Sequence, residues 1–469
     1  MFAAVAFLLA AGSAVATACS DPGPISEYRP PLVTTDLGDA STSTADAPIL
    51  LGSDTEPPCV NLQCKQKKDC PAGGTTSLSG KVLDPSGKIP LYNALVYVPN
   101  AAVDVFKPGI ACDRCASVPS GRPIAVTLTD AKGEFVLKNV PVDVNVPVVV
   151  QIGRWRRQVT VPTVAACKDT PLDAEVTRLP RSKAEGDIPQ IAISTGGADA
   201  IECFFRKLGI APAEFTNPSG PGRVHLYQGK RTDPFGTVVD GSKIDNATPT
   251  GKALWDSLDE LKKHDIVVLS CEGDENDGPT GTMSAAAKQN IFDYVNAGGR
   301  VFASHYHYTW IKKGIAPLPT TANWVPNVDE GDRTVTVDQS FPRGQALAEW
   351  LQNVGATATP GKIAMIDLRK NVASVNPAVS RQWIHDPGVS TKYFSFNTPI
   401  GKPVAEQCGR TVYTDIHVSS GDIAGGTFPA NCVTGGLFPQ EKALLFLIMD
   451  LASCIGDDGK PPEPPPLPK

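Results

Sequence analysis

The stretch of sequence that decides the fold reads KKHDIVVLSCEGDE at 262–275, TMSAAAKQNIFDYVNAGG at 282–299 and RVFASHYHYTW at 300–310. The apolar, β-branched run Asp265–Ser270 predicts a strand buried on both faces. Apolar residues recur every three to four positions over Ala285–Ala297, which predicts a helix that two glycines end. Arg300–Ser304 predicts a second buried strand, so that strand, helix and strand make a parallel pair.

Polar side chains follow both of these strands directly. CEGDE at 271–275 follows the first strand, and the second ends in Ser304, which precedes His305, Tyr306 and His307. Ligands bind beyond the carboxyl ends of parallel strands. The sequence therefore predicts that any binding or catalytic site of this chain lies there.

Composition excludes two classes of interaction. The chain has 469 residues, 41% hydrophobic and 20% charged, which is typical of a globular protein of two or three domains. A formal net charge of −6 and the lack of a Lys/Arg cluster argue against a nucleic-acid partner. After the N-terminus no apolar run reaches the roughly 18 residues that a membrane span needs.

The N-terminus predicts export. Met1–Ala18 is apolar and small, as in the hydrophobic region of a secretory signal peptide. ATAC at 16–19 resembles a bacterial lipoprotein cleavage site, which implies a lipid on Cys19. With Ser20 after that cysteine, the resemblance implies anchoring at the outer membrane or cell surface. The alternative is plain secretion after cleavage near Ala18.

The rest of the chain divides into four segments by composition. Segment 19–74 is rich in Pro, Ser, Thr and Asp, which predicts a disordered tether that contains cysteines. Short alternating strands predict an all-β sandwich over 75–170, and alternating strands and helices predict an α/β domain with a parallel sheet over 187–456. A proline-rich tail follows at 457–469. Few contacts are expected to cross the polar segment 172–186 between the two domains.

The cysteine count agrees with export. Of 12 cysteines, 11 remain if Cys19 is lipidated (12 − 1), six of them before the α/β domain and five within it. An exported chain pairs most of its cysteines, so one free thiol is expected in the α/β domain. Cys112 and Cys115 form a C-x-x-C, for which a structural disulfide is favoured over a zinc or thioredoxin motif because no second C-x-x-C is present.

The β segment carries a recognisable pattern in SGKVLDPSGK at 79–88 and TLTDAKGEFVLKNVP at 127–141. It resembles the carboxypeptidase regulatory-like domain, a transthyretin-like sandwich. The signature T-D-x-x-G-x-F of that family falls on Thr129, Asp130, Gly133 and Phe135. The resemblance implies the fold and a spacer or adhesion module, with carbohydrate binding among related folds.

The α/β segment has three matching stretches, DIVVLSCEGDE at 265–275, IFDYVNAGGRVFASHYH at 291–307 and GRTVYTDIH at 409–417. It resembles the class I glutamine-amidotransferase-like fold, a flavodoxin-like parallel sheet, and within it the ThuA-like branch. Active amidotransferases carry a cysteine after the strand that here ends at Ser304, where this chain has His305. The resemblance implies a degenerate amidotransferase-like domain, with His417 where the catalytic histidine of the family falls.

The whole chain also resembles secreted bacterial proteins that are sometimes labelled tryptophan synthase alpha chain. That label implies a (β/α)₈ barrel. An export signal, a β-sandwich and 12 cysteines contradict it.

A metal site is the first chemistry that the residues suggest. His305 and His307, and likewise Asp415 and His417, are spaced by two residues, which places each pair on one face of a strand. Imidazole and carboxylate are suitable ligands for zinc. The alternative is that these histidines only make hydrogen bonds within an aromatic wall. No organic cofactor is expected, and zinc is the candidate metal.

A serine hydrolase is the second chemistry that the residues suggest. Ser304 would be the nucleophile and His417 the base, with His305 beside them and Asp415 or Glu272 as the orienting acid.

The third chemistry is Cys271 as a reactive thiol, although Glu272, Asp274 and other nearby acids are expected to raise its pKa.

The function that the sequence favours is an exported, lipid-anchored protein of the cell envelope with a non-catalytic α/β domain. It would bind a glycan or envelope polymer through polar and aromatic residues at the strand ends, namely Glu272, Asp274, Tyr306 and Asp415. The alternative is a hydrolase at the cell surface that depends on a metal or on a serine.

Overall fold

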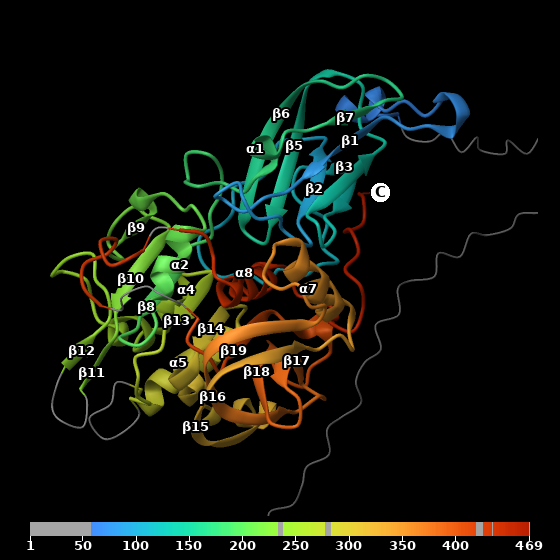
Figure 1. The fold of residues 1–469 in the computed structure, drawn as a ribbon. Helices are drawn as coiled ribbons and strands as arrows, with labels where there is room; N and C mark the ends of the chain where they lie inside the picture. Colours follow the sequence, from blue (N-terminus) through green and yellow to red (C-terminus); the bar gives the residue numbers. More distant parts are fainter. Residues whose placement is uncertain (1–57, 233–237, 277–282, 419–424, 434, 469) are drawn as a thin grey trace, which may run out of the picture. The chain divides into compact units, whose positions relative to one another are not determined.

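A computed structural model describes residues 58–232, 238–276, 283–418, 425–433 and 435–468 (Figure 1). Pro58–Lys469 forms one compact unit. Within the described residues, no helix has the length and apolarity to cross a bilayer. The signal peptide, Cys19 and most of the expected tether lie outside the described residues.

The β segment forms two sheets. One has the order β4-β1-β7 and the other β3-β2-β5-β6. The strands are β1 Ser77–Lys81, β2 Leu95–Pro99, β3 Pro123–Leu128, β4 Glu134–Lys138, β5 Val144–Ile152, β6 Trp155–Thr163 and β7 Asp169–Pro171. Side chains from both sheets, such as Leu78 and Val148, belong to one buried cluster. The predicted β content is confirmed, whereas the transthyretin-like topology stays a prediction.

The predicted turn between β3 and β4 forms as the sequence indicates. The Asp130 carboxylate accepts hydrogen bonds from the backbone N–H groups of Lys132 at 2.8 Å and Glu134 at 2.9 Å. Gly133 has a φ of +71°, a conformation that glycine adopts without steric cost. The turn places Phe135 in the core.

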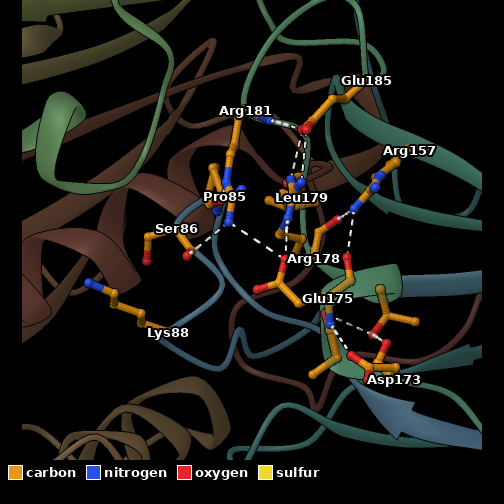
Figure 2. Close-up of polar contacts among 12 residues, drawn as sticks. Pro85, Ser86, Lys88, Arg157, Asp173, Glu175, Arg178, Leu179, Arg181 and Glu185 are labelled. Atoms are coloured by element: carbon orange, nitrogen blue, oxygen red, sulfur yellow. Dashed lines mark hydrogen bonds and ion pairs between the residues drawn. The ribbon is translucent and has the colours of Figure 1, made fainter.

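Ion pairs and hydrogen bonds hold the segment 172–186 (Figure 2). The segment contains helix α1 Ala174–Thr177. The guanidinium of Arg178 donates to both oxygens of Glu185 at 2.7 and 2.8 Å, and Arg181 donates to the Pro85 carbonyl at 2.8 Å. The Arg178–Glu185 pair lies within the segment and supplies the partner that a buried guanidinium needs, whereas the Arg181 contact ties the segment to the β region.

A ten-stranded sheet organises the rest of the chain, in the order β16-β15-β17-β18-β19-β14-β13-β8-β10-β9 (Figure 1). Six strands are parallel. These are β8 Ile191–Thr195, β9 Phe215–Thr216, β10 Val224–Gln228, β13 Ile266–Leu269, β14 Arg300–Ser304 and β19 Gly409–Thr414. The central five, β10-β8-β13-β14-β19, have the order 2-1-3-4-5 when counted along the chain.

Alternate residues of the central strands belong to different hydrophobic clusters. In β13, Ile266 and Val268 belong to one cluster and Val267 and Leu269 to the other. The first cluster includes α2 Ile201–Lys207, α7 Pro342–Asn353 and α8 Pro439–Ala452; the second includes α3 Gly251–Trp255, α4 Leu258–Lys262 and α5 Ala285–Asn296. The sheet is therefore buried on both faces, as the uninterrupted apolar runs of its strands predict.

The other four strands are antiparallel and form the second half of the sheet. They are β15 Ala322–Val337, β16 Lys362–Val375, β17 Ser380–Asp386 and β18 Ser390–Thr398. The ribbon of β15 and β16 has four register shifts, so its side chains do not alternate regularly.

The remaining elements are short. They are the 3₁₀ helices η1 Asn61–Lys65, η2 Pro71–Gly73, η3 Pro212–Glu214, η4 His305–Tyr308, η5 Leu318–Thr321 and η6 Val404–Glu406, the helix α6 Thr309–Lys312 and the strands β11 Lys230–Thr232 and β12 Val238–Asp240.

Five disulfides join the described cysteines, and Cys271 is free, as the odd count predicts. Cys112 and Cys115 do not form a disulfide with each other. Cys112 pairs with Cys408 and Cys115 with Cys454, so both disulfides are structural but link the loop before β3 to the α/β region. The other pairs are Cys59–Cys64, Cys70–Cys167 and Cys203–Cys432. This number of disulfides indicates an oxidising, extracellular environment.

Candidate functional site

Cys271, His305 and His417 meet at the carboxyl ends of three adjacent parallel strands. Cys271 lies two residues beyond β13, His305 directly follows β14, and His417 lies three residues beyond β19. Their ligand atoms lie within 4.8 Å of one another. Cys271 and His305 are 0% and 1% exposed, whereas the His417 side chain is 15% exposed. The cluster is therefore buried at its base and reaches solvent through His417.

His305 stands at a sharp turn from strand to helix. Its φ is +41°, a left-handed conformation that residues with a Cβ rarely adopt. The buried Tyr413 hydroxyl donates to the His305 carbonyl oxygen at 3.1 Å and so supports this backbone. Strained backbone of this kind is concentrated at functional sites.

The outer nitrogen of each histidine contacts an oxygen that can only accept a hydrogen bond. His305 Nε2 lies 3.2 Å from Asn327 Oδ1, and His417 Nδ1 makes a short contact with Asp367 Oδ2. Both outer nitrogens therefore carry a proton, and the lone pairs of His305 Nδ1 and His417 Nε2 remain. These two nitrogens face each other at 3.2 Å, and the Cys271 sulfur lies 3.5 Å from His305 Nδ1.

Two facing lone pairs repel each other unless a cation lies between them, and in the metal-free chain that cation is a proton. Burial opposes charge on His417, but the Asp367 carboxylate and the Cys271 sulfur raise its pKa to about 10. Burial also opposes the thiolate, but the two histidines lower the pKa of Cys271 to about 6. Both shifts favour the ion pair of a thiolate and an imidazolium. The expectation that nearby acids raise the pKa of this thiol is wrong.

His307 does not join the cluster. His305–Tyr308 is a 3₁₀ helix, in which residues two apart point in different directions, so the expected shared face of a strand does not exist. His307 Nε2 donates to the Ser270 carbonyl at 2.9 Å, and Nδ1 accepts from the Trp310 indole at 3.0 Å. Burial lowers the pKa of His307 to about 4, so it is neutral. Both nitrogens are occupied.

Asp415 does not join it either. Its carboxylate accepts hydrogen bonds from the backbone N–H groups of Asn371 and Val372 and from the Tyr413 hydroxyl. These contacts tie the end of β19 to β16. The sequence predicted four metal ligands, His305, His307, Asp415 and His417. The structure instead brings together three candidate ligands, Cys271, His305 and His417.

Ser304 and Glu272 lie beside the cluster without contacting its histidines. The Ser304 hydroxyl donates to Asp199 Oδ2 at 2.8 Å. Glu272 is 2% exposed, and burial together with the neighbouring Cys271 raises its pKa to about 8. Asn276 donates to Glu272 Oε2, while Oε1 has no hydrogen-bond partner among the described residues.

The expected binding residues Asp274 and Tyr306 lie closer to solvent. Asp274 is exposed, and its carboxylate accepts from the N–H of Glu275 at 2.7 Å. Tyr306 is half-buried, its ring centroid lies 4.2 Å from that of His305, and its hydroxyl accepts from Asn327 Nδ2 at 3.1 Å. Tyr306 therefore forms part of the rim of the cluster, whereas the hydrogen bond of the Asp274 side chain within the described part of the chain goes to the backbone of Glu275.

Sequence reasoning missed Asp367 and Asn327, and it considered Cys271 only as an isolated thiol. The odd number of cysteines and the position of Cys271 at a strand end were sufficient to join it to the histidines. Asp367 and Asn327 lie on β16 and β15, which were not predicted, so no signal pointed to them.

No family model matches the chain, and no curated protein matches it. Among solved structures, a ThuA-like protein from Bacteroides uniformis is 12% identical over 55% of this chain and 87% of that chain, with a TM-score of 0.27. Two cohesin–X-dockerin complexes from Acetivibrio cellulolyticus are 16% and 14% identical over 27% and 32% of this chain and 79% of each of those chains, with TM-scores of 0.16. The first carries the family name that the α/β segment resembles. TM-scores this low carry no argument about fold or activity.

Proposed function

We propose that the chain is a zinc-dependent hydrolase of the cell envelope, with zinc held by Cys271, His305 and His417. The observation that carries the proposal is the spacing of the three ligand atoms. Bonds of about 2.05 Å to nitrogen and about 2.3 Å to sulfur at tetrahedral angles separate two nitrogens by about 3.3 Å, and nitrogen from sulfur by about 3.5 Å. In this chain the two nitrogens are 3.2 Å apart, Cys271 Sγ lies 3.5 Å from His305 Nδ1, and all three ligand atoms lie within 4.8 Å of one another.

The surroundings of the cluster suit a metal. Histidine ligands usually donate their second N–H to a carboxylate or carbonyl oxygen, which fixes the ring and raises its basicity. Asp367 and Asn327 supply these acceptors for His417 and His305. Zinc would replace the proton that lies between the two imidazoles and would bind the thiolate, because metal ligands bind in their deprotonated forms.

Three protein ligands favour catalysis over a purely structural role. Structural zinc sites have four protein ligands, whereas catalytic sites have three and leave one position for water or substrate. A zinc ion in such a site polarises a carbonyl or phosphoryl oxygen as a Lewis acid. The His417 and Asp367 side chains, 15% and 41% exposed, mark the side from which a substrate reaches the cluster.

A second candidate is a cysteine hydrolase with the same residues. The lowered pKa of Cys271 and the chain of contacts from Cys271 through the histidines to Asp367 favour it. In that case the thiolate attacks the substrate, His417 carries the proton, and Asp367 orients His417. The serine hydrolase is disfavoured because Ser304 contacts Asp199 instead of a histidine.

The N-terminal sequence and the disulfides together support a location of the protein outside the cytoplasm. We infer an exported chain that is anchored to the membrane through a lipid on Cys19. The β segment before the hydrolase would then act as a spacer or as a module for a glycan or envelope polymer. A Cys19→Ala change should move the mature protein from the membrane fraction to the medium.

Metal analysis of the exported, folded protein tests the proposal. We expect one zinc per chain, and X-ray absorption at the zinc edge should give one sulfur and two imidazoles among the neighbours. Hydrolysis of generic ester, amide and phosphoester substrates should stop on chelation and return with zinc. Activity that survives chelation but ends on alkylation of Cys271 would support the cysteine hydrolase. A protein without metal and without turnover would leave a ligand-binding role.

A further inference from the structure

A hydrogen-bonded pair of buried histidines lies at the amino ends of the parallel strands, opposite the Cys271 cluster. His225 is the second residue of β10, and His264 lies two residues before β13. They are 9% and 0% exposed, and His225 Nδ1 lies 3.0 Å from His264 Nε2. In the sheet β8 lies between β10 and β13, so the pair joins two strands across the amino end of a third.

The charged and titratable groups around the pair come from the elements that pack against it. They are Glu260 on α4 and Lys263 after it, Tyr227 on β10, Tyr294 on α5, and Arg223 and Asp265, which precede β10 and β13. Burial lowers the pKa of both histidines, to about 4 for His264, although the Glu260 carboxylate favours the charged rings. Both rings are therefore neutral at neutral pH.

In the neutral pair the position of each proton is fixed from both ends. His264 Nδ1 lies 3.0 Å from the Glu260 carbonyl oxygen, which only accepts, so Nδ1 carries the proton and Nε2 has a lone pair. His225 Nδ1 therefore donates to His264 Nε2, and His225 Nε2 accepts from the Gln190 amide at 3.0 Å. Arg223 donates to the Gln190 amide oxygen at 3.5 Å, which orients the amide in this way. Each ring nitrogen then has a matching partner.

The intact pair holds at most one additional proton. His225 Nε2 can take it, because the Gly220 and Gly222 carbonyls favour the charged form of that ring. A second proton, on His264 Nε2, would face the proton on His225 Nδ1, so the two rings would have to separate. In an unfolded chain both histidines titrate near a pH of about 6.5. Acid therefore favours the separated rings, which bind more protons.

We propose that His225 and His264 form an acid-sensitive link, which joins β10 to α4 and to the start of β13 at neutral pH and releases them in acid. The link does not depend on the proposed zinc. Because the pKa of His264 is lower in the folded chain, the link gives its full stability above about pH 6.5 and loses it as the pH falls toward about 4. Once the link is released, β10 has only the two residues of β9 on its outer side, so this edge of the sheet should open first.

Hydrogen exchange of the full exported protein, corrected for the intrinsic exchange rate, tests the link locally. Between about pH 7.5 and about pH 5 the protection of residues 223–229 should fall by roughly 30-fold, because opening raises the pKa of His264 from about 4 to about 6.5. His264→Gln should remove this fall, because its amide oxygen still accepts from His225 Nδ1 but takes up no proton.

The matched control is His385→Gln, which changes a half-buried histidine on β17 whose pKa is also lowered by burial. This variant should retain the fall in protection. The proposal is overturned if the wild type is equally protected at both pH values, or if His264→Gln shows the same fall as the wild type.

Nitrogen-15 NMR of the wild-type histidine rings reads the protons directly, and it decides if His264→Gln does not fold. At about pH 6 we expect two neutral rings with the proton on Nδ1 of each, joined by a coupling across the N–H···N hydrogen bond. Two charged rings at that pH would contradict the proposal, because the link would then not exclude protons.

Discussion

The parallel and antiparallel halves of the ten-stranded sheet contribute to the candidate site in different ways. The parallel half supplies the three inner atoms, from Cys271, His305 and His417. The antiparallel half supplies the two outer acceptors, Asn327 on β15 and Asp367 on β16. In the proposed zinc site, the parallel half would decide which ion binds, and the antiparallel half would decide how firmly the histidines are oriented.

The largest effect is expected from the parallel half. Cys271→Ala or His417→Ala should abolish stoichiometric zinc, because two remaining ligands do not hold the ion. Elemental analysis after gel filtration measures this. His385→Ala, a half-buried histidine on β17, is the matched control and should keep one zinc per chain. Full zinc occupancy in both ligand variants would contradict the assignment of this cluster as the metal site.

Metal removal should be the next largest effect. An ion that binds only the folded chain stabilises it in proportion to the logarithm of its excess over Kd. Chelation should therefore lower the Tm of the wild type, and zinc should restore it. Cys271→Ala should melt at the same temperature with and without chelator. If the Tm of the wild type is the same with and without the chelator, no metal is coupled to folding.

A smaller effect is expected from Asp367→Asn in the antiparallel half. The amide keeps the shape but loses the charge that stabilises protonated Nδ1 of His417, so zinc affinity should fall by about 10- to 100-fold with the ligands intact. Competition against a chromophoric chelator measures the affinity. An affinity equal to that of the wild type would mean that the antiparallel half does not tune the site.

Asn327→Ala should have a weaker effect than Asp367→Asn. The Asn327 amide is neutral and exposed, and water can take its place on His305 Nε2. We expect a loss of zinc affinity below that of the Asp367 variant in the same competition assay. The reverse order would assign the main orienting role to β15 and not to β16.

Ser304→Ala should leave both metal and activity unchanged. The variant loses one buried hydrogen bond to Asp199, which is worth about 1 kcal/mol of stability. Denaturant unfolding measures that cost, and turnover of the generic substrates measures activity. Loss of turnover with zinc still bound would bring back Ser304 as the nucleophile.

The parallel half was largely predictable from the sequence for a physical reason. Its strands are buried on both faces, so Ile266–Leu269 and Arg300–Ser304 stand out as apolar runs, and residues after them must lie at one edge of the sheet. This argument placed His305 and His417 together. It did not show that His307 lies outside the cluster, because that depends on the 3₁₀ helix into which the chain turns directly after the strand.

The antiparallel half was not predictable in the same way. β15 contains Pro326, Gly331 and several charged residues, and its register against β16 shifts four times. Period-two alternation is lost in such a ribbon, so neither strand has the usual sequence signal. Asp367 has a φ of +55°, which depends on its place in the folded ribbon. The residues that orient the histidines could therefore be identified only from the folded structure.

In the proposed exported chain, the two disulfides that Cys112 and Cys115 form would set an order of events during export. Cys115 pairs with a cysteine 339 residues further along the chain, and Cys112 with one 296 residues further. Vectorial transport delivers both thiols to the oxidising side long before Cys408 and Cys454 arrive. During that interval the two neighbouring thiols are available to each other and to oxidants. We expect maturation to depend on a disulfide isomerase, which would open a premature Cys112–Cys115 bond.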